Sequence, residues 1–437
     1  MDVHAVAGFR ARAEQLDAKD PLPLPGEFEF PPVPPPLPTS NAPASLREFA
    51  SCAYFAGNSL GLLSASSRSA VQETLDSWST RAVSGHFVGS QPWSEQADRM
   101  APLLAKIVGA NAHEVTVMNS LTINLHLVLA SLYRPTKARR KIAIEAGAFP
   151  SDDYAAAAHV RWHGLDSSEL VRLAPDNESG LFSHQSLVTQ ITALGPVLGA
   201  VVLGAVNFRT GQLLDIEGLT AVAQRAGAVV IWDLAHAAGN VELKLHDWNV
   251  DAAIWCNYKY LNGGPGCPGG LYVHERFASD SSLPRLHGWW GNDADTRFEM
   301  RTAIDLGTGA GGWQVSTPTA LAMTPLRASL ENFDRVGFET LHARSRRLTG
   351  FLEELFDLVR ATHVMDQITP RSARERGAQL SMLVHDAPGV SNTLRALGVV
   401  ADERPPNIVR FAPTALTSSF VDCWRAATAL LETLPLR

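Results

Sequence analysis

One lysine of this chain has neighbours that suit covalent chemistry. Lys259 follows an apolar run, has a tyrosine on each side and precedes a glycine-rich stretch at 263–266. A lysine placed where a buried strand meets such a loop can form a Schiff base with a cofactor aldehyde. The other five lysines occur in polar or helical segments that favour exposure. The alternative is a lysine that caps the loop and lays its stem across the tyrosines.

A buried acid is expected at the end of an earlier apolar run. Asp233 follows Val-Val-Ile-Trp at 229–232, and a carboxylate there needs a cationic or donating partner. A protonated pyridine nitrogen is such a partner, so Asp233 and Lys259 together predict a site for pyridoxal 5′-phosphate. A salt bridge or a helix cap would also satisfy Asp233. His236 follows closely, at a place where packing is as common a role as ligand contact.

Three further residues lie near the ends of predicted strands or within one. Thr122 opens a helix whose backbone amides could bind a phosphate, although an ordinary capped helix explains the segment equally well. Phe149 follows the next strand and could stack on a planar cofactor, but an aromatic there is more often part of the core. Arg410 is a charge inside the apolar run 408–411 and requires a carboxylate, either from the protein or from a substrate.

The composition limits the possible partners. The chain has 437 residues, 46% of them hydrophobic, which is enough for two domains with a sizeable core. Its net charge of −7 and lack of Lys/Arg clusters argue against nucleic acid. Four scattered cysteines indicate neither a disulfide framework nor a metal site, and no apolar run reaches the ~18 residues of a membrane helix. We expect a cytoplasmic protein that binds no membrane.

Strand-like and helical segments alternate through the middle of the chain. Apolar β-type runs occur at 115–118, 141–144, 200–206, 229–232 and 252–256. Helical periodicity occurs at 66–79, 94–108, 120–132, 151–163 and 214–226. This alternation predicts an α/β fold with a mostly parallel sheet covered on both faces.

The two ends of the chain differ from the middle. Prolines, densest at 21–38, predict an extended N-terminal arm without helix. After helices at 318–358, a small α+β unit is predicted from a strand at 378–384, a helix at 390–397, a strand at 408–411 and a helix at 418–431. We expect an arm and part of the small domain at 1–65, a cofactor-binding large domain at 66–333 and a small domain at 334–437.

Seven segments, in order along nearly the whole chain after the arm, resemble kynureninase. They are GNSLGL (57–62), MNSLTINLH (118–126), AFPSD (148–152), DLAHAAGNVEL (233–243), LHDW (245–248), YKYLN (258–262) and GWWG (288–291). The resemblance implies a pyridoxal phosphate enzyme of fold type I, with a seven-stranded sheet and a small α+β domain. It also implies a homodimer that cleaves kynurenine or 3-hydroxykynurenine to alanine and an anthranilate, in tryptophan catabolism and NAD biosynthesis.

The resemblance also implies which residues form the site. Lys259, Tyr258 and Asp233 would be catalytic, and the cofactor contacts fall on Leu121, Thr122, Phe149, Ser151, Asp152, Gly204, Asp233, His236, Tyr258 and Lys259. Trp289 and Thr317 would complete the cofactor site of the neighbouring subunit. The substrate contacts fall on Ser59, His86, Thr317 and Arg410.

Three positions depart from the family's pattern. Gly204 stands where many members have a serine facing the cofactor, so one hydrogen bond is in question. Thr317 replaces an asparagine beside the substrate ring of animal-type enzymes, and Asn292 replaces a histidine. His86 is the polar residue found in relatives that prefer 3-hydroxykynurenine. These changes affect ring specificity and leave the reaction type unchanged.

Three other functions stay open at this point. A hydrolase of a substituted kynurenine in natural-product biosynthesis would fit the altered ring pocket. A cysteine desulfurase-like lyase shares the fold but needs a reactive cysteine on a mobile loop, and the only cysteine in the last third of the chain, Cys423, falls in a predicted helix. A non-catalytic pyridoxal phosphate-binding module would be expected to lack Lys259 or Asp233.

Overall fold

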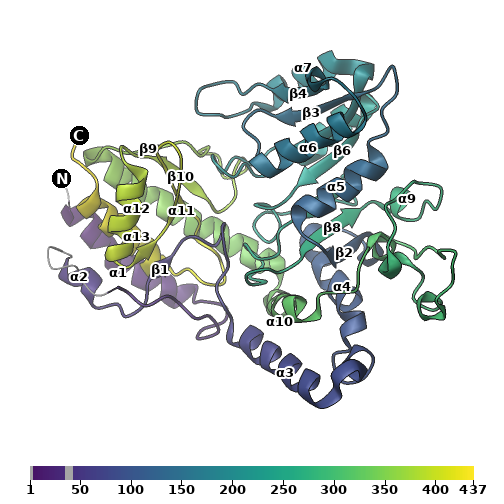
Figure 1. Cartoon of the computed structure of the whole chain (residues 1–437). Coiled ribbons are helices and arrows are strands. Elements are labelled where there is room, and N and C mark those ends of the chain that lie inside the picture. Colours follow the sequence, from purple (N-terminus) through teal and green to yellow (C-terminus); the bar gives the residue numbers. More distant parts are fainter. Residues whose placement is uncertain (1–2, 35–42) are drawn as a thin grey trace. The chain divides into compact units, whose positions relative to one another are not determined.

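The computed structural model describes residues 3–34 and 43–437 (Figure 1). The chain divides into two compact units. The sheet unit comprises Ser69–Phe208 and Leu214–Asp334, and the terminal unit comprises Met1–Arg68, Arg209–Leu213 and Arg335–Arg437. The two ends of the chain therefore belong to the same unit.

A seven-stranded sheet forms the centre of the sheet unit. Its strand order is β2 (Val115–Met118), β8 (Gly269–Val273), β7 (Ala252–Trp255), β6 (Val229–Asp233), β5 (Leu198–Gly204), β3 (Lys141–Glu145) and β4 (Leu170–Leu173). β8 is antiparallel to both of its neighbours, and all other neighbouring pairs are parallel. The predicted α/β class with a mostly parallel sheet is confirmed.

Two strands of this sheet were not predicted from the sequence. β4 carries Arg172 in the middle of four residues, and β8 begins with two glycines, which weaken a strand pattern. The structure explains Gly270, because a Cβ atom there would lie 2.0 Å from the side chain of Trp255 on neighbouring β7. The glycine makes room for the fully buried indole.

Helices accompany the sheet strands. They are α3 (Ala65–Arg81), α4 (Gln96–Val108), α5 (Leu121–Leu132), α6 (Pro150–Trp162), α7 (His184–Leu194), α8 (Ile216–Arg225), α9 (Glu275–Ala278) and α10 (Ala320–Val336). α5 and α6 pack on each other, and their apolar side chains form one buried cluster with those of the sheet, Leu125, Val128, Ile142 and Ile144 among them. Each such side chain contributes roughly 1.5–3 kcal/mol on burial.

The terminal unit is built on a four-stranded antiparallel sheet. Its order is β12 (Asp402–Arg404), β13 (Ile408–Phe411), β10 (Leu380–Leu383) and β9 (Asp366–Gln367). A parallel pair, β1 (Ala53–Tyr54) and β11 (Val399–Val400), joins an N-terminal segment to the C-terminal part. The helices are α1 (Val3–Lys19), α2 (Ala44–Arg47), α11 (Phe338–Thr362), α12 (Ala387–Ala396) and α13 (Phe420–Thr433).

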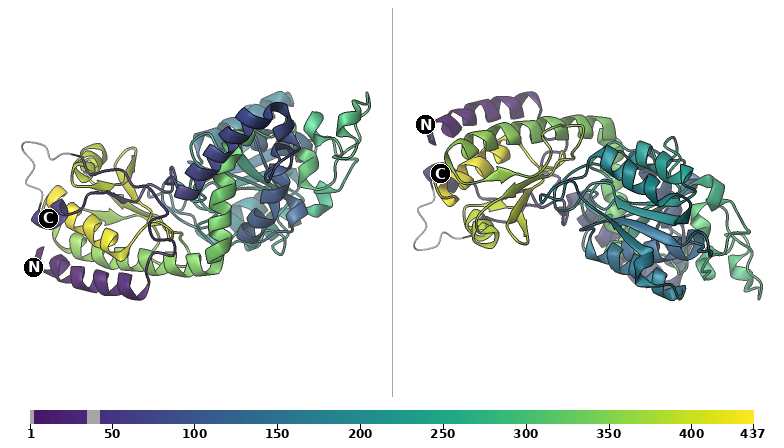
Figure 2. Two further views of the ribbon diagram at one scale, coloured as in Figure 1. Left: turned by 90° about the horizontal axis from the view of Figure 1, so that it is seen from below. Right: turned by 90° about the horizontal axis from the view of Figure 1, so that it is seen from above.

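The prediction of an extended arm without helix is wrong for its first part. Residues 3–19 form α1, which lies alongside α11 (Figure 2) and packs on α13. The indole nitrogen of Trp424 donates to the carbonyl oxygen of Val6 at 3.0 Å, and Asp17 accepts from two backbone amides at the start of α13. The prolines that favour an extended arm all follow α1. Residues 35–38 of the proline-rich stretch lie outside the described residues.

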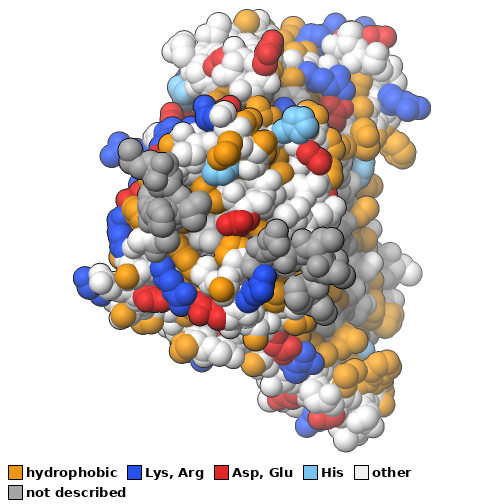
Figure 3. All heavy atoms as spheres, turned by 90° about the vertical axis from the view of Figure 1, so that its left-hand side faces the viewer, with side chains coloured by type: hydrophobic (Ala, Val, Ile, Leu, Met, Phe, Trp, Pro, Cys, Tyr) orange, Lys and Arg blue, Asp and Glu red, His pale blue; other side chains and the backbone are white. Residues whose placement is uncertain are grey.

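The surface mixes charge with apolar groups. On the face drawn in Figure 3, side chains of both charge signs lie among apolar ones. Among the helices of the described part of the chain, none has the length and apolar character needed to span a membrane.

Candidate active site

A pocket with about 770 Å³ of space lies at the carboxyl ends of β3, β5, β6 and β7 in the sheet unit. Parallel α/β sheets bind ligands at this edge. Ten residues predicted from the sequence line the pocket: Leu121, Thr122, Phe149, Ser151, Asp152, Gly204, Asp233, His236, Tyr258 and Lys259. The sheet thus brings together side chains from distant parts of the chain.

The loop after β7 fixes the position of Lys259. Asn257 is fully buried, and its side chain accepts from the indole of Trp255 at 2.7 Å and donates to the carbonyl oxygen of Pro268 at 2.7 Å. The amide of Gly263 donates to the carbonyl oxygen of Asn257 at 2.9 Å, which closes the loop around the lysine. Nζ of Lys259 lies 3.1 Å from Nε2 of His236. The lysine is held by a rigid turn between two strands.

Two aspartates share the end of the pocket near β6. Oδ1 of Asp233 accepts from the amide of Ala235 at 2.7 Å, and the side chains of Asp152 and Asp233 are hydrogen-bonded to each other. Burial and the charge of Asp233 hold the pKa of Asp152 well above its usual range. Burial also raises the pKa of Asp233, but the hydrogen bond from Asp152 and the charge of Lys259 oppose this rise. Of the two carboxyl groups, Asp152 is therefore the one that is more easily protonated.

The starts of two helices offer hydrogen-bond donors to the pocket. The hydroxyl groups of Thr122 and Ser151, at the starts of α5 and α6, are hydrogen-bonded to each other. Neither of these helices has a side chain capping its first turn, so backbone amides there can donate to an anion. Phe149 is 46% exposed, and its ring is perpendicular to that of Phe208 at 5.3 Å. Such a ring can stack on a flat ligand.

Three predicted residues of the sheet unit do not line this pocket. Trp289 is 44% exposed, and its indole donates to the carbonyl oxygen of Arg297 at 3.0 Å. His86 ends a short 3-10 helix and packs edge-on against Trp93 at 5.1 Å. Thr317 precedes α10.

Arg410 and Ser59 meet in the terminal unit. Arg410 is fully buried, with Nε donating to Oδ1 of Asp402 at 2.7 Å and Nη2 donating to the Ser59 hydroxyl at 2.9 Å. The protein itself thus supplies a carboxylate for Arg410. Burial would raise the pKa of Asp402, but the hydrogen bonds and charge of Arg410 hold it below its usual value. The ion pair with Asp402 orients the guanidinium group of Arg410.

Known proteins with similar sequences decide the family. A kynureninase of Salinispora tropica is 48% identical over 90% of this chain and 92% of that protein. A kynureninase of Myxococcus xanthus is 44% identical over 96% of each. The chain belongs to the kynureninase family. The family description "Kynureninase C-terminal domain" matches residues 341–430 of this family member.

Solved structures show the same fold with other activities. The cystine C-S lyase C-DES, in complex with cysteine persulfide, has a TM-score of 0.74 at 18% identity, covering 89% of this chain and 100% of that one. The cysteine desulfurase CsdA of Escherichia coli has a TM-score of 0.70 at 16% identity, covering 90% and 97%. At 16–18% identity the likeness establishes the fold alone. This fold is the fold type I that the resemblance in sequence implied. Burial raises the pKa of all four cysteines of this kynureninase family member, which disfavours a desulfurase thiolate.

Sequence reasoning missed several residues of the pocket. They are Ser120, Glu145, Val206, Asn207, Phe208, Ala235, Cys256, Cys267 and Gly269. Glu145 had a usable signal, because it ends an apolar strand in the same way as Asp233. Phe208 follows β5 by four residues and belongs to the same edge.

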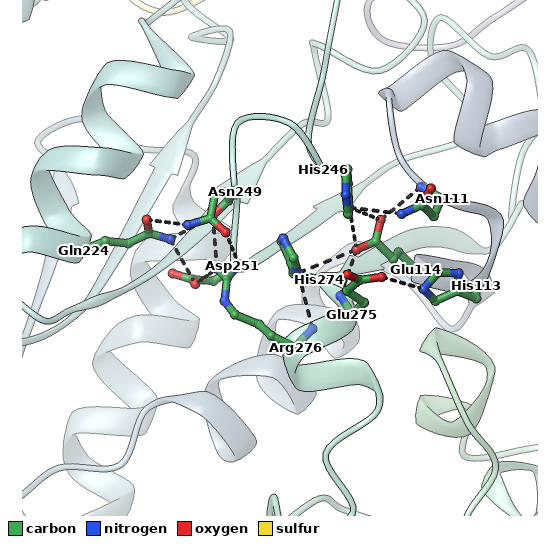
Figure 4. Close-up of polar contacts among 10 residues, drawn as sticks. All are labelled: Asn111, His113, Glu114, Gln224, His246, Asn249, Asp251, His274, Glu275 and Arg276. Atoms are coloured by element: carbon green, nitrogen blue, oxygen red, sulfur yellow. Dashed lines mark hydrogen bonds and ion pairs between the residues drawn. The ribbon is translucent and has the colours of Figure 1, made fainter.

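A second polar cluster of the sheet unit surrounds the buried carboxylate of Glu114 (Figure 4). Glu114, His246 and His274 lie close enough to hold a cation by distance alone. However, Glu114 accepts from the backbone amides of Asn111 and Glu275 and from Nδ1 of His246 at 3.0 Å. Nδ1 of His274 already accepts from the amide of Arg276. These bonds satisfy the carboxylate as a structural anchor between the segments before β2 and after β8.

We expect the His246 contact to make stability depend on pH. Its hydrogen bond to Glu114 raises the pKa of His246 above its unfolded value. The stabilisation is therefore fully present below about pH 6.5 and is lost as the pH rises through the folded-state pKa. Thermal unfolding of His246→Gln should show its largest deficit at low pH. The control is His113→Gln, whose exposed pair with Glu275 should matter little. An equal deficit at all pH values would contradict the charged pair.

Proposed function

We propose that this chain is a pyridoxal phosphate-dependent hydrolase that cleaves L-kynurenine, 3-hydroxy-L-kynurenine or both. The products are L-alanine and anthranilate or 3-hydroxyanthranilate. The observation that carries the proposal is one pocket with a lysine at one wall and a buried aspartate at another, in a member of the kynureninase family. A fold neighbour, a C-DES variant with a TM-score of 0.72 and 18% identity over 88% of this chain and 98% of that chain, is described with glycine covalently linked to its PLP cofactor.

The pocket fits this cofactor in charge and shape. Asp233 would accept a hydrogen bond from the pyridine nitrogen and keep that nitrogen protonated, and Phe149 would stack on the ring. The amides and hydroxyls at the starts of α5 and α6 would bind the phosphate. When bound, pyridoxal phosphate supplies an electron sink for the carbanion formed at the substrate α-carbon.

Two side chains of the chain would move protons. Lys259 would take the proton from the substrate α-carbon once the substrate amine has displaced it, with His236 3.1 Å away to share the proton. Burial raises the pKa of the Tyr258 hydroxyl, so this group stays protonated and acts as a donor. Tyr258 would bind the phosphate and, with Lys259, assist the addition of water to the γ-carbonyl. The two residues would also help to deliver a proton to the β-carbon that becomes the methyl group of alanine.

Ser59 and Arg410 would bind the α-carboxylate of the substrate. Their hydrogen bond to each other supports a joint role, and Asp402 sets the plane of the guanidinium. A carboxylate anchored by arginine orients the bonds that must break. His86 and Thr317 would contact the aromatic ring of the substrate.

Product analysis tests the reaction and its ring specificity together. We expect alanine and an anthranilate from both kynurenine and 3-hydroxykynurenine, with kynurenine at least as good a substrate. Threonine offers a ring hydroxyl one partner where asparagine offers two, so Thr317→Asn should favour 3-hydroxykynurenine several-fold. Turnover of neither compound would contradict the function. Turnover confined to ring-substituted analogues would favour the biosynthetic alternative.

We further propose a homodimer with shared active sites. Phe87, Trp289 and Phe298 form an aromatic patch with side chains 55%, 44% and 45% exposed, and Phe298 lies 5.2 Å from Phe87 and 5.5 Å from Trp289. Exposed apolar clusters of this kind mark interaction surfaces. The patch would meet a second copy of the chain and bring Trp289 to its pocket.

The dimer has a direct test. Phe298→Glu places a charge in the aromatic patch and is expected to give inactive monomers in sedimentation velocity experiments. Trp162→Glu is the matched control, because Trp162 is 85% exposed outside the patch and should leave a dimer. An active monomer of Phe298→Glu would refute the shared site.

The buried free cysteines also support a cytoplasmic location, where thiols stay reduced.

A further inference from the structure

Glu145 is a buried carboxyl group of the pocket that the roles above do not use. It ends β3, is 4% exposed and lines the pocket. Oε1 accepts a hydrogen bond from the amide of Gly204 at 3.1 Å. Oε2 is buried and has no hydrogen-bonding partner among the described residues. A buried polar atom in this state normally has a ligand or a water as its partner.

The position of Glu145 depends on the glycine beside it. A Cβ atom added to Gly204 would lie 2.9 Å from Oε1 of Glu145, with no other atom near it. Any other residue at 204 would therefore require the Glu145 carboxyl group, at the free end of a flexible side chain, to move from its present place. Gly204 pairs in register with Asp233 on neighbouring β6, so this contact belongs to the end of the pocket that would hold the pyridine ring.

We propose that Glu145 is a further cofactor-binding residue, whose carboxyl group lies against Gly204 and supplies through Oε2 the polar contact that a serine at 204 would otherwise bring to the ring. The inference rests on the proposed cofactor site and adds one ligand to it. With glycine at 204, the carboxyl group of Glu145 on the adjacent strand then takes the place of a serine hydroxyl. It occupies the space that the hydroxyl would fill.

The charges around Glu145 suit a hydrogen-bond donor. Burial raises the pKa of Glu145 to about 7; the charges of Asp233 and Asp153 add to this, and its own backbone amide and that of Gly204 oppose it. The pocket already holds the carboxyl groups of Asp152 and Asp233, with Lys259 as the nearby cation. A protonated carboxyl group adds no further negative charge there and can donate through Oε2.

Cofactor affinity of the apoprotein tests the proposal without measuring catalysis. The dissociation constant for pyridoxal phosphate should rise about tenfold in Glu145→Ala, the usual effect of losing one hydrogen bond. Glu145→Gln keeps an acceptor for Gly204 and a donor for the ligand, so it should stay within about threefold of the unchanged protein. Glu169→Ala is the matched control, because Glu169 is also buried but precedes β4 at the opposite edge of the sheet.

Substitution of Gly204 gives a second test. We expect it to change cofactor affinity in opposite directions with and without Glu145. Gly204→Ser should weaken cofactor binding when Glu145 is present, because the new Cβ displaces the Glu145 carboxyl group from its place beside the ligand. In the Glu145→Ala background the same change should strengthen binding, because the hydroxyl fills the vacated place. Thermal unfolding of each apoprotein confirms that the variants are folded.

The outcomes separate this inference from the proposed function. If the unchanged protein binds pyridoxal phosphate through Lys259 but Glu145→Ala binds it equally well, Glu145 is not a ligand and the proposed function stands. If Gly204→Ser changes cofactor affinity in the same direction with Glu145 and with Glu145→Ala, the exchange of polar groups is refuted. If the unchanged protein does not bind the cofactor, the proposed function and the inference fall together.

Discussion

Lys259→Ala is expected to abolish both the covalent attachment of pyridoxal phosphate and turnover. The loop closed by Asn257 holds only this lysine in the pocket among the described residues. Loss of a group that acts as both nucleophile and base should lower turnover by about a thousandfold or more. The purified protein should be yellow, and the variant should lack this colour.

Borohydride reduction followed by peptide mapping locates the attachment. Lys244→Ala is the control, because Lys244 is exposed and pairs with Glu242 on the surface. A label on any lysine other than Lys259 would refute the site.

Asp233→Ala is expected to lower turnover by about a hundredfold or more, the scale of losing a preorganised charge in an active site. The pyridine nitrogen would lose the anion that keeps it protonated, and Asp152 would lose its hydrogen-bond partner. Cofactor attachment to Lys259 should persist, because the lysine loop does not depend on Asp233. Stopped-flow spectra should show substrate binding without the long-wavelength absorbance of the stabilised carbanion.

Arg410→Lys provides the contrast to Asp233→Ala. It keeps a cation beside Asp402 but loses the planar, two-pronged geometry, so KM should rise with little change in kcat. An unchanged KM would mean that Arg410 serves only its ion pair with Asp402. Full turnover of Asp233→Ala would remove the aspartate from the mechanism.

The pocket residues on strand ends could be predicted from the sequence for a physical reason. Parallel strands place their carboxyl ends at one edge, so Asp233 and Lys259 converge although each was identified alone. Glu145 carries the same signal, but its relevance depends on the close approach of Gly204, which no local pattern encodes.

Other features depended on contacts that the local pattern does not show. The partner of Arg410 follows from register, because β12 and β13 form a hairpin that places Asp402 opposite Arg410. β12 consists of three charged residues, so no apolar pattern predicts it as a strand. α1 shows apolar residues at Val6, Phe9, Ala13 and Leu16, a helical spacing that the prolines after it obscured.

The contact between α1 and α13 has a consequence for synthesis. α1 leaves the ribosome long before α13, on which it packs, and Asp17 accepts from the opening amides of α13. The terminal unit therefore cannot complete its core until α13 has been translated, whereas the strands of the sheet unit lie earlier in the chain than α13 and can pair sooner. During that interval α13 does not yet cover the apolar face of α1, and we expect chaperones to bind the nascent chain there.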